Sequence, residues 1–497
     1  MERAVTITDA REHLDDAARA WLDSVHGTGS GPTFEVLDPG TGRVLAELPA
    51  ATDADVNNAV EGARVAFEDG RWSERDADHR EEVLLRLAQL VERDFELLVT
   101  IEALDTGKPR AEAWYDIKEV IGVLRYYAGW CTKATGTTIP APRQYFAVTL
   151  RGPVGVCAAI TPWNYPLPIL MYKLAPALAF GNSFIAKPSE LAPLSALHFA
   201  RLCAEAGVPD GVVTVLTGAG STGAALAAHP GLDKIAFTGS TRTGRAIARA
   251  AAERPTRVSL ELGGKSPNIV FASADLEAAA DGVALGIWTN AGQVCVAGSR
   301  LLVERSIHDR FVDLLAERTE AMVLGHSLDP EAQVGPMISA TQRASAENVV
   351  ASALDDGAVA VTGGHALAGP GFFLEPTMLT GLATDHPVSQ EEIFGPVLVV
   401  DTFDTEREAV AKGNATAYGL AAGVWTGRAG QGHRMARGLS AGTVWINTYG
   451  MFHPTLPFGG TKASGYGREL GESAVEAYTE ITTVVEDLSA GEGGSHD

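Results

Sequence analysis

Residues 234–244 read KIAFTGSTRTG, a short apolar strand that runs into the start of a helix through small residues. Further β-rich runs lie between Gly152 and Phe271, separated by helical stretches: residues 154–160, 183–186, 212–216, 258–262 and 268–271. Strands and helices in alternation predict a parallel sheet with helices on both faces, the doubly wound α/β architecture. Such sheets bind ligands beyond the carboxyl ends of their strands, so the functional side chains are expected just after these runs.

The segment Thr238-Gly239-Ser240, with Gly244 in the following helix, is one such place. Backbone N–H groups and the helix dipole favour a phosphate there, and Ser240 adds a hydroxyl. The spacing differs from the G-x-G-x-x-G of ordinary dinucleotide folds. A helix-capping turn without a ligand is therefore an equal alternative.

Lys187 and Glu190 follow another strand of the same predicted sheet, where the ribose of a nucleotide would lie. A glutamate there would accept hydrogen bonds from ribose hydroxyls and repel a 2′-phosphate, which favours NAD over NADP. The alternative is a solvated carboxylate at the start of a helix that opens at residues 189–191.

Glu261 is a carboxylate in an otherwise apolar strand, followed by Gly263, Gly264 and Lys265. Burial of a carboxylate is costly, so the group is either paired or has a raised pKa, and a raised pKa suits a general base. A salt bridge to a neighbour such as Lys265 is the structural alternative.

Cys295, preceded by Gly292-Gln293-Val294, sits among small residues that a substrate could approach closely. A free thiol has a pKa near ~8.5 and needs help from its surroundings to act as a nucleophile. Alone, a cysteine in such a segment is more often a buried core residue than a nucleophile. Asn164, between two aromatic residues on a Pro-flanked loop, offers an uncharged donor for an oxyanion, or simply forms a turn. Glu392 and Glu469 lie in short Gly-flanked segments.

Composition excludes several classes of protein. The 497 residues predict two or three domains. The net charge of −23 argues against nucleic-acid or anionic-membrane partners. The four cysteines have neither metal-site nor disulfide-framework spacing, which fits a reducing compartment. No signal peptide and no membrane span is recognisable, so a cytoplasmic location is expected.

The remaining chain supplies support. Residues 33–48 predict a hairpin, and residues 53–67, 81–104 and 111–130 predict helices, with Thr52 as an N-cap. A second α/β region follows from about residue 274 to residue 447, with strands expected at 397–400, 420–425 and 443–446. Residues 489–497 are polar and Gly-rich, which predicts disorder.

The motifs TPWNYP, KPSE, FTGS, ELGGK, GQVCVAG, EEIFGP, PFGGTKASG and GRELGE occur together, from near residue 30 to near residue 485. In this combination the chain resembles the NAD(P)-dependent aldehyde dehydrogenase superfamily. The resemblance implies a Rossmann-type cofactor domain (residues 1–131 and 151–261), an α/β catalytic domain (262–465) and a β arm with a C-terminal segment (132–150 and 466–497). Family architecture also implies a homodimer or homotetramer joined through that arm.

The resemblance further implies roles for individual residues. Cys295 corresponds to the nucleophile, Glu261 to the general base, Asn164 with the Cys295 N–H to the oxyanion site, and Glu469 to a proton relay. Lys187 corresponds to a supporting and ribose-binding residue. The implied cofactor contacts are Ile160, Thr161, Trp163, Lys187, Glu190, Thr238, Gly239, Ser240, Gly244, Leu262, Gly263, Glu392 and Phe394. NAD is the expected cofactor, with NADP possible, and no metal is expected.

The implied reaction begins with thiolate attack on the aldehyde to give a thiohemiacetal, which transfers hydride to the nicotinamide. The resulting thioester is hydrolysed by water activated by Glu261. The branch of the family that transfers the acyl group to CoA typically lacks this base, so Glu261 favours hydrolysis to the acid.

The substrate is expected to be a hydrophobic or aromatic aldehyde, packed against Tyr165, Tyr172, Trp288 and Phe458. The alternative is a betaine aldehyde or aminoaldehyde, held by cation–π contacts. Relatives with that specificity use tryptophan at several of these positions, whereas Tyr172 and Phe458 stand here. Glu119 could anchor an amine or lie on a solvated helix face. A thiol esterase, which would act without NAD, and a non-catalytic protein, which would not need Cys295 and Glu261, are more distant alternatives.

Overall fold

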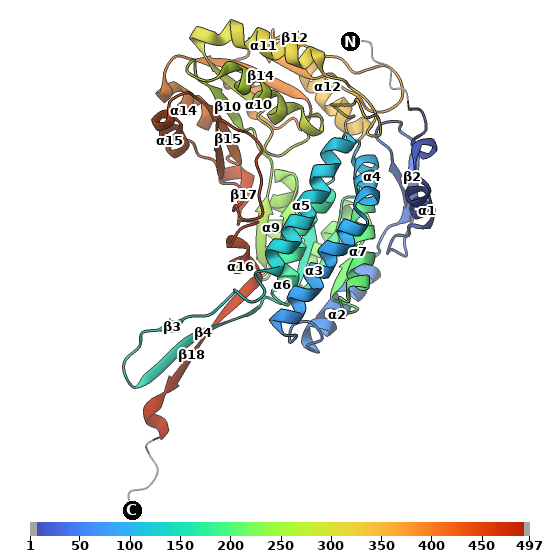
Figure 1. Ribbon diagram of the computed structural model, residues 1–497, viewed down its shortest axis with the longest axis vertical. Coiled ribbons are helices and arrows are strands. Elements are labelled where there is room, and N and C mark those ends of the chain that lie inside the picture. Colours follow the sequence, from blue (N-terminus) through green and yellow to red (C-terminus); the bar gives the residue numbers. More distant parts are fainter. Residues whose placement is uncertain (1–6, 492–497) are drawn as a thin grey trace, which may run out of the picture.

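The computed structural model describes residues 7–491, in which two α/β units share the chain with a projecting β arm (Figure 1). The first unit contains a six-stranded sheet in the order β17-β9-β8-β5-β6-β7. Its strands are β5 (Val156–Ile160), β6 (Ser183–Lys187), β7 (Val213–Val215), β8 (Lys234–Thr238), β9 (Arg257–Glu261) and β17 (Gly465–Tyr466). All pairs are parallel except β17 with β9, which confirms the predicted doubly wound sheet.

Helices connect the strands of this first sheet: α6 (Pro166–Ala179), α7 (Leu194–Ala206), α8 (Gly220–Ala228) and α9 (Thr241–Ala252). Strands β5, β6 and β8 are buried along their whole length, as expected for parallel strands covered on both faces. The carboxyl ends of β5, β6, β8 and β9 therefore meet along one edge of the sheet. Helix α7 begins at Leu194, so the helix start predicted at residues 189–191 is wrong.

The second unit holds a seven-stranded sheet in the order β12-β13-β14-β11-β10-β15-β16. Residues 268–270 of the run 268–271, which was expected in the first sheet, instead belong to β10 (Pro267–Val270), an interior strand of this one. There β10 pairs in parallel with β11 (Arg300–Glu304) and β15 (Ala421–Trp425). The other strands are β12 (Val359–Thr362), β13 (Thr377–Thr380), β14 (Val397–Phe403) and β16 (Thr443–Ile446).

The helices of the second unit are α10 (Leu276–Trp288), α11 (His308–Ala321), α12 (Ala340–Asp355), α13 (Pro387–Gln390), α14 (Glu406–Asn414) and α15 (Ala429–Gly438). Figure 1 shows them gathered around the seven-stranded sheet at the top of the molecule.

The N-terminal part contains helix α1 (Asp16–Ser24) and the predicted hairpin, formed by β1 (Thr33–Leu37) and β2 (Val44–Pro49). Helix α2 (Asp53–Glu68) begins with a capping box between Thr52 and Asp55. The predicted helix at residues 81–104 is two helices, α3 (Ala77–Arg93) and α4 (Phe95–Thr106), separated at Asp94. Helix α5 (Arg110–Ala128) packs against α3 and α6.

The arm is a three-stranded antiparallel sheet of β3 (Thr138–Ile139), β4 (Tyr145–Pro153) and β18 (Thr479–Asp487), preceded by helix α16 (Ser473–Tyr478). It extends away from both sheets (Figure 1). Residues 492–497 of the tail predicted to be disordered lie outside the described residues, as do residues 1–6. No helix within residues 7–491 combines the length and apolarity needed to cross a bilayer.

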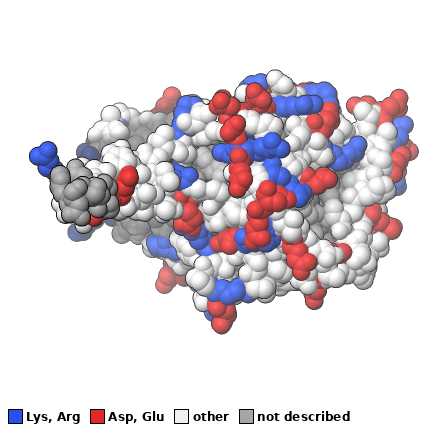
Figure 2. All heavy atoms as spheres, turned by 90° about the horizontal axis from the view of Figure 1, so that it is seen from below, with Lys and Arg blue, Asp and Glu red and all other residues white. Residues whose placement is uncertain are grey.

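Acidic and basic side chains are interspersed over the face shown in Figure 2. The excess of acidic residues therefore does not form a surface of a single sign on that face.

Candidate active site

One cavity of about 410 Å³ contains most of the predicted catalytic and substrate residues. Its wall includes Cys295, Glu261, Glu469, Thr238 and Leu262, together with the four predicted aromatic residues Tyr165, Tyr172, Trp288 and Phe458. These side chains come from β8, β9, α6, α10 and five loops, so only the folded chain brings them together. The wall is mainly apolar, with the acidic groups concentrated in a few places.

The loop before Cys295 is held in an unusual backbone conformation. Asn290 and Ala291 have φ angles of 49° and 52°, which non-glycine residues rarely adopt. Gly292 has φ 71°, and a Cβ there would lie 2.2 Å from the carbonyl oxygen of Gly395. The side chain of Gln293 fixes the loop, because its Nε2 donates to the Asn290 carbonyl (2.9 Å) and its Oε1 accepts from the Ile338 N–H (2.9 Å).

Asn164 lies buried against this same loop. Its Nδ2 donates to the Gln293 carbonyl at 2.9 Å, and Asn290 Nδ2 donates to the Asn164 carbonyl at 3.1 Å. The amide nitrogen makes no second hydrogen bond within residues 7–491, and Asn164 is not among the residues that line the cavity. The structure thus places Asn164 against the Gln293 backbone, two residues before Cys295 in the sequence.

The environment of Cys295 opposes ionisation. Burial, together with the nearby carboxylates of Glu392 and Glu261, raises the pKa of its thiol to about 12. No cation is among the causes of this shift. The surroundings therefore do not lower the thiol pKa, as the sequence analysis had required of a nucleophile. Cys295 is therefore a neutral thiol in this state and needs a proton acceptor to react.

Glu261 is buried at the end of β9. Burial, together with the nearby Glu469 carboxylate, raises the pKa of Glu261 well above its usual range. The alternative of a salt bridge to Lys265 is wrong, since neither group has a hydrogen-bonding partner among residues 7–491. Glu261 thus has the raised pKa expected of a general base rather than a structural ion pair.

A buried lysine that sequence reasoning missed supports this region. Lys173, on α6, has no solvent exposure, and its ammonium forms an ion pair with Glu469 and donates to Thr238 Oγ1 at 2.8 Å. The lysine is the sole charged residue in the apolar run of α6, which was the available signal. The ion pair thus connects Lys173, in the interior, with Glu469, which lines the cavity together with Glu261.

The predicted cofactor residues lie along the carboxyl edge of the first sheet. Ser240 caps α9 by accepting from the Thr243 N–H (3.2 Å), and a Cβ at Gly244 would lie 2.5 Å from the Leu262 side chain. Lys187 Nζ and Glu190 Oε2 are 3.4 Å apart. At the end of β5, Ile160 is buried and the Thr161 hydroxyl is buried with no partner among the described residues.

The second unit contributes two residues to the same edge. The Gly264 N–H donates to Glu392 Oε1 at 2.9 Å, and a Cβ at Gly263 would lie 2.1 Å from Glu392 Oε2. Phe394 packs edge-on against Trp163, with ring centroids 5.3 Å apart. A Cβ at Gly264 would lie 2.4 Å from the Cys295 carbonyl oxygen. The two glycines therefore let the Cys295 loop, the segment after β9 and Glu392 approach one another closely.

Several aromatic side chains of the cavity wall contact other side chains of the protein. Lys108 Nζ lies 3.9 Å from the centroid of the Tyr165 ring. Trp288 Nε1 donates to Thr319 Oγ1 at 3.2 Å, and Phe458 packs edge-on against Phe452. Glu119 lines the cavity and accepts from the Tyr172 hydroxyl at 2.6 Å, so its placement on a solvated helix face is wrong.

A model of the aldehyde dehydrogenase family matches residues 26–484. The chain belongs to this family. It is 45% identical over 459 residues to retinal dehydrogenase 2 of Gallus gallus, covering 92% of this chain and 89% of that protein. It superimposes on an aldehyde dehydrogenase from Bacillus cereus in complex with NAD+, with TM-score 0.93, 43% identity and coverage of 96% and 99% of the two chains. An indole-3-acetaldehyde dehydrogenase with NAD+ gives TM-score 0.91, 43% identity and coverage of 93% and 94%.

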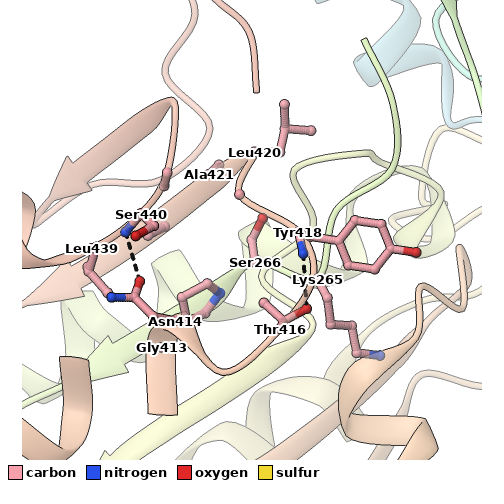
Figure 3. A pocket seen from close by; sticks show the side chains of 14 residues that line it. Lys265, Ser266, Gly413, Asn414, Thr416, Tyr418, Leu420, Ala421, Leu439 and Ser440 are labelled. Carbon is pink, nitrogen blue, oxygen red and sulfur yellow. Dashed lines mark hydrogen bonds between the residues drawn. The ribbon is translucent and has the colours of Figure 1, made fainter. Parts of the chain in front are cut away.

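This aldehyde dehydrogenase has a second, much smaller hollow beside Lys265, Ser266 and Tyr418, of about 10 Å³ (Figure 3). Burial lowers the pKa of Lys265 to about 7, with a further contribution from Arg300. A space of this size holds about one water molecule, and none of the predicted site residues lines it. The cavity that contains Cys295 is therefore the candidate active site.

Proposed function

We propose that the chain oxidises an aldehyde to its carboxylic acid with NAD, through a covalent intermediate on Cys295 that is hydrolysed with the help of Glu261. The observation that carries this proposal is the placement of both residues on the wall of one cavity. In the same place the Glu261 motif approaches the Cys295 backbone closely, since a Cβ on Gly264 would lie 2.4 Å from the Cys295 carbonyl oxygen. The family is the second support, since its members include NAD+ complexes of the same fold.

Each of these residues has a definite task in the proposed reaction. Glu261 accepts the thiol proton of Cys295, whose sulfur then attacks the aldehyde carbon. The free N–H of Asn164, together with the Cys295 backbone N–H, donates to the resulting oxyanion. Loss of hydride from the thiohemiacetal leaves a thioester on Cys295. Glu261 then takes a proton from the attacking water, and the acid leaves as the thiol re-forms.

Glu469 and Lys173 hold protons close to Glu261 in this scheme. The Lys173 ammonium compensates the charge of Glu469. The Glu469 carboxylate itself raises the pKa of Glu261. A second carboxylate and an ammonium therefore lie near Glu261 when it has accepted a proton. We infer that these two groups return Glu261 to its basic form between the two half-reactions.

The carboxyl edge of the first sheet has groups that fit NAD. The start of α9 and Ser240 suit the pyrophosphate, and Lys187 with Glu190 suits the adenine ribose. The hydroxyl of Thr161, which has no partner among the described residues, can form a hydrogen bond with the nicotinamide half. The absence of a side chain at Gly263 leaves space beside Glu392 for the same half of the cofactor. When bound, NAD supplies the hydride acceptor. Glu190 would repel the 2′-phosphate of NADP, so NAD is the preferred form.

The substrate that fits the cavity best is a hydrophobic or aromatic aldehyde. The wall is dominated by aromatic and aliphatic side chains, among them Ile169, Trp288, Met322, Phe452 and Phe458. A cation-binding aromatic cage is less well supported, because the Lys108 ammonium already occupies one face of Tyr165.

We further propose the domain roles and assembly. The six-stranded unit with residues 1–131 binds the cofactor, the seven-stranded unit carries the nucleophile, and the arm joins subunits into a homodimer or homotetramer in the cytoplasm. The arm supports this assembly because it exposes several large apolar side chains: Ile139, Tyr145, Phe146, Leu150, Ile481, Val484 and Val485. Sedimentation of the wild type and of Val485→Lys tests the assembly; a monomeric wild type would refute it.

Formation of NADH with a panel of aldehydes tests the activity. The panel contains benzaldehyde, a medium-chain alkanal, betaine aldehyde and an ω-aminoaldehyde, each with NAD and with NADP. We expect turnover with NAD, highest for the first two. Cys295→Ala should abolish turnover and retain NAD binding, whereas Cys131→Ala, a buried thiol outside the cavity, should remain active. Silence across the panel, or ester hydrolysis independent of NAD, would refute the proposal.

A further inference from the structure

Helix α5 presents three carboxylates to an otherwise largely apolar cavity. Glu112, Asp116 and Glu119 lie at spacings of four and three residues, which places them on one face of the helix. A carboxylate withdrawn from water is costly unless another group compensates its charge or donates to its oxygens. The partners of each group therefore decide which of the three can receive a ligand.

Two of these carboxylates are satisfied by the protein. Asp116 forms an ion pair with the fully buried ammonium of Lys108. Glu112 accepts the backbone N–H of Asn290 on both oxygens, at 2.9 and 3.2 Å. Glu112 thus holds the loop before Cys295, and Asp116 holds the lysine that lies over the Tyr165 ring. The oxygens of both carboxylates are therefore engaged by protein groups and do not call for a substrate.

Glu119 lacks such compensation. Its Oε1 accepts the Tyr172 hydroxyl at 2.6 Å, and within the described part of the chain no group donates to its Oε2 and no cation forms a salt bridge with it. Burial raises the pKa of Glu119 to about 7. Glu119 is half-buried, so its Oε2 is an acceptor on the cavity wall that has no donor among residues 7–491.

We propose that Glu119 is a specificity-determining residue that recognises an N–H or O–H donor carried by the aldehyde at a distance from its carbonyl group. This inference rests on the proposed function and deepens it, since it names the substrate class: a hydrophobic or aromatic aldehyde with a hydrogen-bond donor. Tyr172 positions the carboxylate by holding Oε1, which leaves Oε2 to face the ligand.

A donor group fits Glu119 better than a quaternary ammonium does. A trimethylammonium head has no N–H to satisfy Oε2 and relies on aromatic faces instead. Of those faces, Tyr165 is in contact with Lys108, and the Tyr172 hydroxyl is held by Glu119 itself. A site built to bond a polar N–H or O–H discriminates strongly against the analogue that lacks it, because its own polar group is then left unpaired.

Matched pairs of aldehydes test this role. One pair is indole-3-acetaldehyde and its N-methyl form, and the other is para-hydroxyphenylacetaldehyde and its para-methoxy form. A protonated ω-aminoaldehyde and betaine aldehyde form a third pair that separates an ammonium donor from a quaternary cation. The ratio of kcat/KM within each pair is measured with NAD for the wild type, Glu119→Gln and Glu119→Leu. Glu82→Gln, the same change on the exposed face of α3, is the control.

We expect the wild type to prefer the donor member of at least one pair by about ten-fold or more, the range of a hydrogen bond to a charged group. Both Glu119 variants should reduce that ratio toward one, through a larger loss of kcat/KM for the donor member than for the methylated member, whereas Glu82→Gln should keep the wild-type ratio. A wild type that oxidises both members equally, or a ratio unchanged in both variants, would overturn the role of Glu119 while leaving the proposed function intact. Failure to oxidise any aldehyde would overturn the proposed function.

Discussion

The ammonium of Lys173, which has no solvent exposure, forms an ion pair with the carboxylate of Glu469, a buried group on the wall of the cavity. The pair joins α6 to a loop that precedes α16, 296 residues away in the sequence. It places a compensated charge beside Glu261, which has no ion-pair partner of its own within residues 7–491. The pair therefore contributes both to the fold and to the electrostatics of the candidate base.

Replacement of Lys173 by Met should destabilise the protein by ~3–5 kcal/mol, because it leaves the carboxylate of Glu469 buried without a counterion. Urea unfolding measures this loss. Lys118→Met, which removes an exposed lysine from α5, should change stability by less than ~0.5 kcal/mol. A loss below ~1 kcal/mol in Lys173→Met would show that the pair is unimportant for stability.

Gly264→Ala should reduce kcat/KM roughly 100-fold, since the added Cβ would meet the Cys295 carbonyl and displace the nucleophile. Steady-state NADH formation measures the effect. Gly62→Ala is the matched control, because a Cβ there meets open space on α2. An active Gly264→Ala enzyme would mean that the close approach of these two segments does not position Cys295.

Alkylation of Cys295 by iodoacetamide in the absence of NAD should accelerate about ten-fold per pH unit between about pH 7 and about pH 9. The reason is that the thiol has a pKa of about 12, so the reactive thiolate fraction rises with pH throughout this range. Peptide mass spectrometry follows the modified residue, with Cys295→Ala defining the background. A rate that levels off below about pH 8 would contradict the raised pKa.

The raised pKa of Glu112 makes stability depend on pH. Burial raises it from 4.5 to about 8, so the folded state binds a proton that the unfolded state has lost between these values. Stability should therefore fall as pH rises from 4.5 toward about 8. Glu112→Gln should flatten this dependence, as measured by the midpoint of urea unfolding across that range. An identical slope in the wild type and in Glu112→Gln would contradict the assignment.

Sequence patterns predicted the strands of the first sheet because buried parallel strands are continuous apolar runs. They could not say which sheet a strand joins. Residues 267–270 continue the apolar pattern of β9, yet they pair with segments at 300–304 and 421–425. Pairing across such distances depends on tertiary contacts that no local pattern contains. The break at Asp94 was missed for a related reason, since helical periodicity continues on both sides of it.

Motifs in the sequence were enough to select Cys295 and Glu261, which the structure places on the wall of one cavity. The candidate site was not predictable where function depends on a distant partner. Glu119 resembles a surface residue until Tyr172 and the rest of the cavity wall are placed around it. The sequence likewise does not show that Lys108 compensates Asp116 and lies over the Tyr165 ring, because both contacts form only in the folded chain.

The most direct test of the central claim is the intact mass of Glu261→Gln after it is mixed with NAD and an aromatic aldehyde and quenched in acid. We predict an adduct with the mass of the acyl group, confined to the peptide that contains Cys295, because thioester formation continues while hydrolysis is slowed. Alkaline hydroxylamine should release it. Steady turnover at the wild-type rate without an adduct, or an adduct on Cys131, Cys157 or Cys203, would contradict the account.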